Sequence, residues 1–307
     1  MTALATVNST VSAVTSDLLD RFIAYVDATE RTIDTYRKAL KQFFVYLNDK
    51  SIYQPTRTDV LNYREELKAS HKPATVQTYI IAIRQFFKWT EIEGIYPDIA
   101  DHVKGAKVDR EHKKDYLTSA QVKAVMQSID RTTEQGIRDY AVLALMFTAG
   151  LRTVEVSRAN IEDLRTAGDQ TVLYIQGKGK AEKADFVRIA PAVEQSIRAY
   201  LKTRKNTKAG DPLFVSTSNN GAGNRLSTRS ISGIVKGHLI DAGYDSDRLT
   251  AHSTRHTAVT LALLGGQTLE AVQQFARHAS IATTLIYSHH LDKAKNECSN
   301  VVAGAIF

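Results

Sequence analysis

The stretch GIRDYAVLALMFTAG, residues 136–150, decides the fold of the second half of the chain. Its nearly continuous apolar character predicts a helix, and Gly150 lies where a helix C-cap favours glycine. A shorter helix is predicted before it, because Thr118 and Gln121 have the spacing of a capping box. Downstream, QTVLYIQGKGKAEKADFVRIA (residues 170–190) predicts two strands joined by a hairpin rich in glycine and lysine.

The residues after Pro191 are predicted to be mostly helical. One short strand, PLFVS at 212–216, interrupts the pattern. The helical periodicity covers residues 192–204, 228–241, 253–264, 268–276 and 280–290. This half is therefore expected to be an α+β domain, mainly α with a small β-sheet.

The N-terminal half predicts a bundle of four helices within residues 16–94. The first begins at a Ser/Asp cap, and the second, TIDTYRKALKQFFVYL, carries apolar residues at helical spacing. Pro55 and Pro73 precede the third and fourth helices, and Gly94 ends the last one. The aromatic residues of these helices are expected to form the core.

The domain boundaries follow from shifts in composition. Residues 101–116, DHVKGAKVDREHKKDY, lose apolar periodicity and become charged, which is typical of an interdomain linker. The first 15 residues have neither the basic segment nor the apolar core of a signal peptide, so a disordered leader is expected. The predicted order is a leader (1–15), a helical domain (16–100), a basic linker (101–116) and a second domain (117–307).

Charge and cysteine content narrow the possible partners. The net charge is +7 and the pI about 9.3, which favours a polyanionic partner such as nucleic acid. Residues 1–100 contain 12 basic and 12 acidic residues, so the excess lies in residues 101–307, with 28 basic against 21 acidic. The single cysteine, Cys298, excludes an internal disulfide and suits the cytosol, and no apolar run reaches the length of a membrane span.

Four stretches carry side chains suited to chemistry, and each is a weak signal alone. GKGK lacks the full phosphate-loop pattern, and HSTRH has metal-compatible histidine spacing but not the glutamate of a zinc protease, so no metal is expected. The stretches are TAGLRTVEV with Arg152, GKGKAEK with Lys178, HSTRHT with His252 and Arg255, and RHASIATTLIY with His278 and Tyr287.

Taken together, these side chains suit attack on a phosphodiester. A tyrosine phenolate is an oxygen nucleophile that needs activation, because its free pKa is about 10. Arginines clamp the negative charge of the transition state, a lysine can protonate the leaving hydroxyl, and histidines can bind phosphate or move protons. The protein supplies the positive charge itself, so neither a metal nor a cofactor is expected.

The motifs AGLRTVE, GKGK, HSTRHT, ARHAS and TTLIYSH occur in the order and spacing of the tyrosine recombinases, or phage integrase family, and the chain resembles that family over nearly its whole length. The resemblance implies a helical core-binding domain followed by a catalytic domain, as in Xer-like or simple mobile-element integrases. It implies that Tyr287 attacks to leave a 3′-phosphotyrosyl link, with strands exchanged through a Holliday junction.

The resemblance also implies the roles of the other residues. Arg152 and Arg255 would bind the phosphate, and His252 and His278 would take the two histidine positions. Lys178 would be the general acid, with Lys180 as a competing candidate. The chain departs from the family pattern at Val154, where a small residue is common, and at ARHAS, which lacks a preceding Leu-Gly. Glu155 and His256 are expected to support the site, whereas no role beyond polarity is expected for His289 and His290.

The resemblance implies a clamp of the two domains around duplex DNA with a specific core site, and a homotetramer on that DNA, with a related recombinase as an alternative partner. The apolar tail (LDKAKNECSNVVAGAIF, 291–307) is expected to dock on a neighbouring protomer, the alternative being its own domain. Rival functions are a type IB topoisomerase-like nicking and rejoining enzyme, or a non-catalytic DNA-binding regulator. The predicted DNA contacts are Arg31, Lys38, Lys41, Thr75, Gln77, Arg84, Lys88, Lys104, Lys107 and Lys113.

Overall fold

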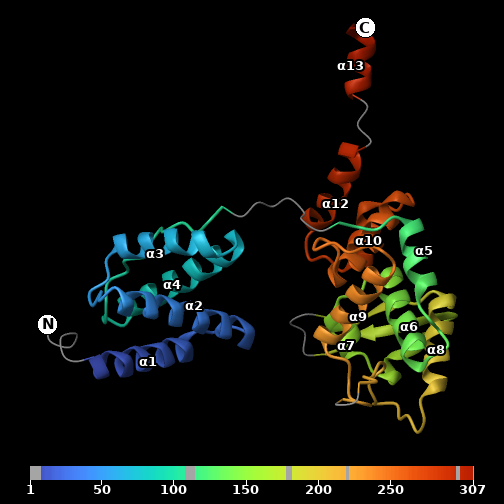
Figure 1. Ribbon diagram of the computed structural model, residues 1–307, viewed down its shortest axis with the longest axis horizontal. Helices are drawn as coiled ribbons and strands as arrows, with labels where there is room; N and C mark the ends of the chain where they lie inside the picture. Colours follow the sequence, from blue (N-terminus) through green and yellow to red (C-terminus); the bar gives the residue numbers. More distant parts are fainter. Residues whose placement is uncertain (1–7, 108–114, 178–181, 219–220, 295–297, 307) are drawn as a thin grey trace. The chain divides into compact units, whose positions relative to one another are not determined.

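The computed structural model describes residues 8–107, 115–177, 182–218, 221–294 and 298–306 (Figure 1). The chain divides into two compact units, the first ending at Glu111 and the second beginning at His112. Separate clusters of buried apolar side chains form the core of each unit. The predicted fold class, mainly helical with a small β-sheet, is confirmed.

Among the described residues the first unit contains four helices, and local signals mark the starts of the last three. Thr29 accepts a hydrogen bond from the Thr32 backbone N–H, and Asp59 accepts one from the Thr56 backbone at 2.7 Å. Pro73 occupies the first turn of its helix, where its missing N–H costs nothing. The helices are α1 (Asn8–Tyr25), α2 (Glu30–Asp49), α3 (Arg57–Ser70) and α4 (Pro73–Ile92).

Helix α1 begins at Asn8, so the prediction of a disordered leader through residue 15 is wrong for residues 8–15. Val11, Val14 and Leu18 extend the helical spacing toward the N-terminus, although the intervening serines and threonines hid that pattern. The rest of the leader lies outside the described residues.

Aromatic side chains from all four helices build the core of the first unit, as the sequence predicted. Phe43 on α2 lies 5.0 Å from Tyr63 on α3 between ring centroids, and Phe22 on α1 lies 5.5 Å from Phe86 on α4. Both contacts are edge-to-face, the arrangement that the charge distribution of aromatic rings favours. Contacts between aromatic rings thus connect all four helices in one core.

Part of the predicted linker belongs to the first unit. Val103 is buried, and Arg57 and Arg64 donate hydrogen bonds to the backbone carbonyls of Asp101 and Lys104. Gly105 lies directly over α4, because a Cβ at this position would come within 2.1 Å of Gln77 Oε1. The prediction that the linker begins at residue 101 is therefore wrong for residues 101–107. A single buried valine, Val103, is too short a signal to be detected within a charged stretch.

The second unit contains nine helices, a 3-10 turn and three strands among the described residues. Every helix predicted there from periodicity is present. The elements are α5 (Ser119–Ser128), α6 (Glu134–Ala149), α7 (Thr153–Arg158), η1 (Ile161–Asp163), β1 (Leu164–Ala167), β2 (Gln170–Ile175), β3 (Asp185–Arg188), α8 (Pro191–Thr203), α9 (Thr228–Asp241), α10 (Ala251–Leu264), α11 (Leu269–Ala276), α12 (Ile281–Ala294) and α13 (Cys298–Ile306).

The sheet is antiparallel, in the order β1-β2-β3. It differs from the prediction in two respects: β1 was not predicted, and the strand predicted at 212–216 is not part of the sheet. Strand β1 was missed because its four residues are mostly exposed and show no apolar alternation. Gly168 makes the tight turn into β2 with a left-handed backbone (φ 62°). The predicted strand at 212–216 forms only isolated bridges, Asn160 with Pro212 and Val215 with Arg225.

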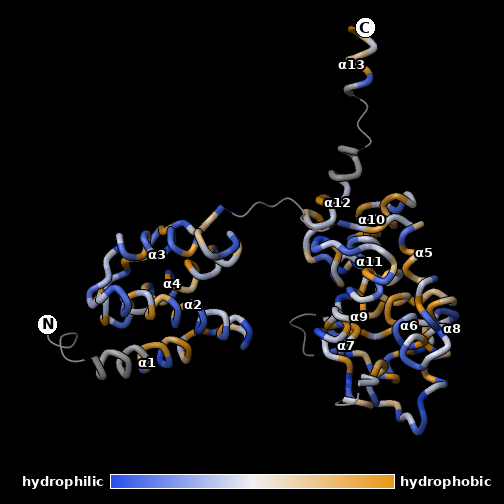
Figure 2. The backbone as a smooth tube through the Cα atoms, in the orientation of Figure 1, coloured by the Kyte–Doolittle hydropathy of each residue, from blue (hydrophilic) through white to orange (hydrophobic). Residues whose placement is uncertain are grey.

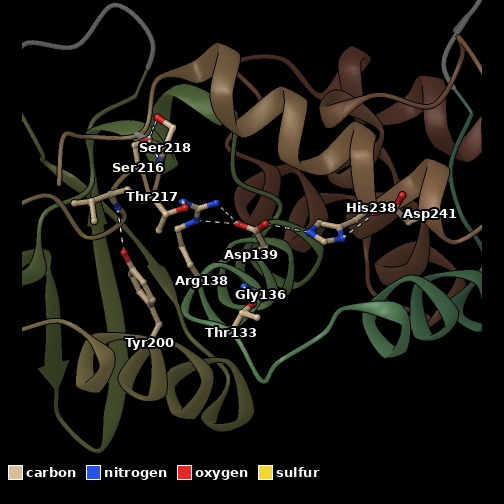
Figure 3. Close-up of polar contacts among 11 residues, drawn as sticks. Thr133, Gly136, Arg138, Asp139, Tyr200, Ser216, Thr217, Ser218, His238 and Asp241 are labelled. Atoms are coloured by element: carbon tan, nitrogen blue, oxygen red, sulfur yellow. Dashed lines mark hydrogen bonds and ion pairs between the residues drawn. The ribbon is translucent and has the colours of Figure 1, made fainter. Parts of the chain in front are cut away.

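Helix α6 forms the centre of the second unit, and a buried polar network ties it to its neighbours (Figure 3). Arg138 donates to Asp139 at 2.8 Å, and to the Val215 carbonyl and Thr217 hydroxyl at 3.1 and 3.0 Å. His238 on α9 contacts the other oxygen of Asp139 at 3.1 Å. Arg138 and Asp139 are both buried, so the network holds three segments together without solvent.

The C-terminal segment forms helix α13, and Figure 2 colours most of it hydrophobic. Val301, Val302 and Ile306 are 69%, 55% and 67% exposed. Exposed apolar side chains at this density are typical of a surface that binds another one. Within the described residues, no helix combines the length and apolarity needed to cross a bilayer.

Candidate functional site

The site begins where α6 ends. Gly150 adopts a left-handed backbone (φ 58°), and the ring of Phe275 lies 3.3 Å from the position a Cβ would take there. The chain then turns through the buried Leu151 to Arg152, which is the N-cap of α7. The glycine at this C-cap therefore fixes the direction from which Arg152 enters the site.

Arg152 is held by a buried carboxylate, Glu155, one turn further along α7. The Arg152 backbone N–H donates to Glu155 Oε2 at 2.8 Å, and its Nη1 donates to Oε1 at 2.9 Å. The Glu155 side chain is 1% exposed, whereas that of Arg152 is 32% exposed. Arg152 thus keeps part of its guanidinium open to solvent, while its two hydrogen bonds to Glu155 set its orientation.

Arg255 comes from α10 and is buried. Its Nη1 donates to the Gly150 carbonyl at 2.7 Å, and its Nη2 donates to the Ala276 carbonyl. Burial, followed by the nearby Arg152 and Arg277, lowers the pKa of Arg255 to about 10. The group remains positively charged at neutral pH.

His278 follows helix α11 and is oriented by α12. Its Nδ1 lies 2.9 Å from the hydroxyl of Thr284, which is completely buried. Burial first, and then the positive charges of Arg255, Arg152, Arg277 and His252, lower the pKa of His278 to about 4. His278 is therefore neutral near pH 7, and with Nδ1 engaged its Nε2 is the nitrogen left for other partners.

Tyr287 lies on α12 and is 5% exposed, packed with Val259, Val272 and Ala276. Its ring centroid is 4.8 Å from that of His256 and 5.9 Å from that of His278. Burial raises the pKa of Tyr287, although Arg255 and Arg152 oppose the shift. The phenol is protonated at neutral pH and needs a base to become a nucleophile.

His252 occupies the exposed first turn of α10, and His256 lies buried one turn below it. The two ring centroids are 5.1 Å apart. His256 lies next to Tyr287, as expected for a supporting residue.

The lysine candidates Lys178 and Lys180 lie outside the described residues, as do His289 and His290 with respect to their side chains. The two arms of their hairpin are described. Arg158 Nη1 approaches the Gly177 carbonyl at 3.5 Å, and Lys183 binds the buried carboxylate of Asp163. Lys183 is therefore committed to a structural ion pair, which leaves Lys178 and Lys180 as the lysines of this hairpin to consider.

Arg277 was not predicted as a site residue. Its Nη2 donates to Glu155 Oε2 at 2.9 Å, so one carboxylate binds both Arg152 and Arg277. The signal was visible in the sequence as the arginine in ARHAS, where the family often has glycine. Thr284 was also missed, because a threonine in a helix gives no sign of a histidine partner.

The predicted DNA contacts are distributed over the first unit. Arg31, Lys38 and Lys41 are exposed on α2, and Arg84 and Lys88 are exposed on α4. Thr75 and Gln77 are partly buried at the start of α4, with Gln77 against Gly105. Lys104 and Lys107 are exposed, and Lys113 lies outside the described residues.

The arrangement suits a reaction at an anion. Three arginines (Arg152, Arg255 and Arg277) surround a single buried carboxylate, so the cluster has excess positive charge. Where burial lowers the effective dielectric, this excess positive charge stabilises a developing dianion more than it would in bulk water. A tyrosine and a neutral histidine lie within the same cluster.

Comparison with known proteins agrees with this geometry. Residues 115–294 match the Phage integrase family, and residues 19–94 match the phage integrase N-terminal SAM-like domain. Tyrosine recombinase XerC of Herpetosiphon aurantiacus is 30% identical over 285 residues, covering 88% of this chain and 90% of that protein. Tyrosine recombinase XerA of Pyrococcus horikoshii is 29% identical over 279 residues, covering 90% of each.

Solved structures show the same fold. The XerH site-specific recombinase, in a post-cleavage complex with palindromic difH substrate, matches with a TM-score of 0.74 and 20% identity, covering 93% of this chain and 85% of that one. The resemblance to the tyrosine recombinases and the enzyme class, both stated from the sequence, are confirmed. The chain belongs to the phage integrase family, and it is a tyrosine site-specific recombinase.

Proposed function

We propose that this protein recombines double-stranded DNA at specific core sites, for integration and excision or for dimer resolution. Tyr287 Oη attacks the scissile phosphorus, and the bond from phosphorus to the 5′ oxygen breaks. The products are a 3′-phosphotyrosyl link and a free 5′-hydroxyl. The link preserves the phosphodiester energy, so a partner strand's 5′-hydroxyl reverses the step and the exchange proceeds through a Holliday junction.

The charged groups of the site take separate roles in this step. Arg152 and Arg255 bind the non-bridging oxygens, where negative charge develops. The phenol proton moves to an imidazole of the site, His252 or His278, and Lys178 or Lys180 protonates the departing 5′ oxygen. No nucleotide cofactor takes part in the proposed reaction.

The observation that carries this proposal is the position of Tyr287. Its ring contacts His256 and His278, and the charges of Arg255 and Arg152 reach its hydroxyl strongly enough to oppose the effect of burial on its pKa. A tyrosine with only a packing role would not need two arginines near its hydroxyl. Because Tyr287 is 5% exposed, its hydroxyl must be uncovered before it meets DNA.

The test is to capture the covalent intermediate. Wild type and Tyr287→Phe are incubated with sheared DNA from the source organism, denatured in SDS, and the attached DNA is sequenced. We expect the wild type to trap discrete sites through the 3′-phosphate and the variant to trap none. Adducts without sequence preference would indicate a topoisomerase-like enzyme, and no adduct despite DNA binding would indicate a regulator.

The two units are proposed to close around the duplex, with the exposed basic side chains of α2, α4 and residues 104 and 107 along the phosphate backbone. Lysines in such positions add affinity, and arginine or glutamine can read base edges. Arg84→Ala should weaken binding to the trapped site at physiological salt. Lys50→Ala is the matched control, because Lys50 is already paired with Glu66.

Assembly is proposed to use the C-terminal tail. The exposed Val301, Val302 and Ile306 of α13 support docking onto a neighbouring protomer, which would link four subunits on DNA. Deleting residues 295–307 should reduce the size of the DNA complex in analytical ultracentrifugation while leaving the melting temperature unchanged. A truncated protein that assembles normally would assign the tail to its own domain.

A further inference from the structure

Arg277 occupies a backbone conformation that favours glycine. Its φ is +52°, and it is the C-cap of α11, with its N–H donating to the Gln273 and Gln274 carbonyls. A left-handed backbone is less favourable for a residue with a Cβ than for glycine. Glycine would close this helix more easily, so the function of the arginine lies in its side chain.

The guanidinium of Arg277 is nearly enclosed. Its side chain is 11% exposed, its Nη1 donates to the Phe275 carbonyl at 2.9 Å, and its Nη2 donates to Glu155 at 2.9 Å. The same Nη2 lies 3.4 Å from the Gly150 carbonyl, which also accepts from Arg255. Arg277 therefore shares one partner with Arg152 and another with Arg255.

The shared partners matter because, among the residues that the structure describes, Glu155 is the one carboxylate bonded to these arginines. Its Oε1 accepts from the Arg152 guanidinium, and its Oε2 accepts from the Arg152 backbone and from Arg277. If Arg277 were absent, the charge of Glu155 would fall on Arg152 alone and cancel it. With Arg277 present, the four groups keep a net charge of about +2, which balances the two negative charges of a pentacoordinate phosphorane dianion.

We propose that Arg277 is a positioning residue of the recombination site: it binds Glu155 and so leaves Arg152 positively charged and oriented toward the scissile phosphate. This inference rests on the proposed function. Arg277 is linked to Arg152 by hydrogen bonds through Glu155, and its other described hydrogen bonds are to the backbone carbonyls of Phe275 and Gly150. Its charge also contributes to the lowered pKa values of Arg255 and His278.

Arg277→Gly separates the side chain from the backbone, because glycine adopts the same left-handed turn without strain. The substrate is a synthetic duplex with the site trapped by wild type, and single-turnover adduct formation is measured together with DNA affinity and thermal unfolding. We expect the adduct rate to fall about 10- to 100-fold with DNA affinity changed less than about threefold. Arg277→Lys should recover part of the rate, since it restores charge but not the planar fork.

A second substrate distinguishes charge from packing. Replacing the scissile phosphate by a methylphosphonate removes one negative charge from the transition state. The loss caused by Arg277→Gly should then shrink to within about threefold, because less positive charge is needed. An equal loss on both substrates would mean that the residue only supports the fold, and would overturn the inference even if the glycine variant is less stable.

Ser51→Gly is the matched control for the backbone. Ser51 also follows a helix with a left-handed backbone (φ 54°), but it lies in the first unit. This change should leave the adduct rate on both substrates unchanged. If Arg277→Gly behaves like Ser51→Gly while wild type forms adducts, the inference fails and the proposed function stands. If wild type forms no adduct, both fail.

Discussion

Two buried carboxylates in the second unit bind arginine, and they do so in opposite ways. Asp139 meets Arg138 and His238, and Arg138 uses its remaining donors on Val215 and Thr217 (Figure 3). Glu155 meets Arg152 and Arg277, with Arg255 close by. The first group contains one arginine for one carboxylate, and the second contains three.

This difference in the number of arginines per carboxylate distinguishes a structural ion pair from an anion-binding site. In the Asp139 network each charge has a partner, so it joins α6 to α9 and to residues 213–218 and leaves nothing for a ligand. In the Glu155 cluster the positive charge exceeds the negative, which is unfavourable in a buried site unless an anion binds. Excess charge, rather than burial, marks the site.

The largest effect on stability is expected at Asp139. Asp139→Asn leaves the buried Arg138 without a counter-charge and should lower the free energy of unfolding by about 3–5 kcal/mol. The measurement is urea denaturation followed by circular dichroism. The single tryptophan, Trp89, belongs to the first unit, so its fluorescence transition should stay unchanged.

Asp245→Asn is the control for that change. Asp245 pairs with Lys236 at 3.0 Å but is 72% exposed, so its loss should cost less than about 1 kcal/mol. Equal losses in the free energy of unfolding for the two variants would mean that the buried Asp139 network stabilises the fold no more than an exposed ion pair does.

The second effect is on rate. Arg152→Ala should slow adduct formation about 10²- to 10³-fold, the usual cost of removing one transition-state contact, and should change stability little because the side chain is partly exposed. Arg165→Ala, on an exposed arginine of β1, is the control for the lost charge. A variant that unfolds as readily as Asp139→Asn would show that Arg152 belongs with the structural pairs.

The smallest effect is the pH dependence of stability. The folded protein holds the pKa of His278 near 4, below its ordinary value of 6.5, so the unfolded chain binds a proton first as the pH falls. The contribution of His278 to stability is complete above about pH 6.5 and decreases toward pH 4. Urea denaturation of His278→Gln between pH 4.5 and 7.5 should show a shallower pH dependence than wild type.

A slope identical to that of wild type would mean that neither burial nor the cationic neighbours hold His278 neutral. The excess positive charge of the Glu155 cluster would then have no measurable effect at His278, although such an excess must disfavour a further proton.

The elements that were predictable share a local signal. The helices after Pro191 and the four helices of the first unit have apolar spacing, caps and prolines that lie within one segment of chain. Strand β1 and the start of α1 were not predictable in the same way. The first has almost no apolar residues, and the second has its few valines separated by serine and threonine.

The sequence by itself determined the two-part fold, the family and the candidate residues, because spacing along the chain carries that information. Only the tertiary structure decided which charges meet. Arg152 and Glu155 lie at the start of α7, Arg255 on α10 and Arg277 at the end of α11, and their contacts join positions 105 and 122 residues apart in the chain. Electrostatic interaction depends on distance in space, and no local pattern records that distance.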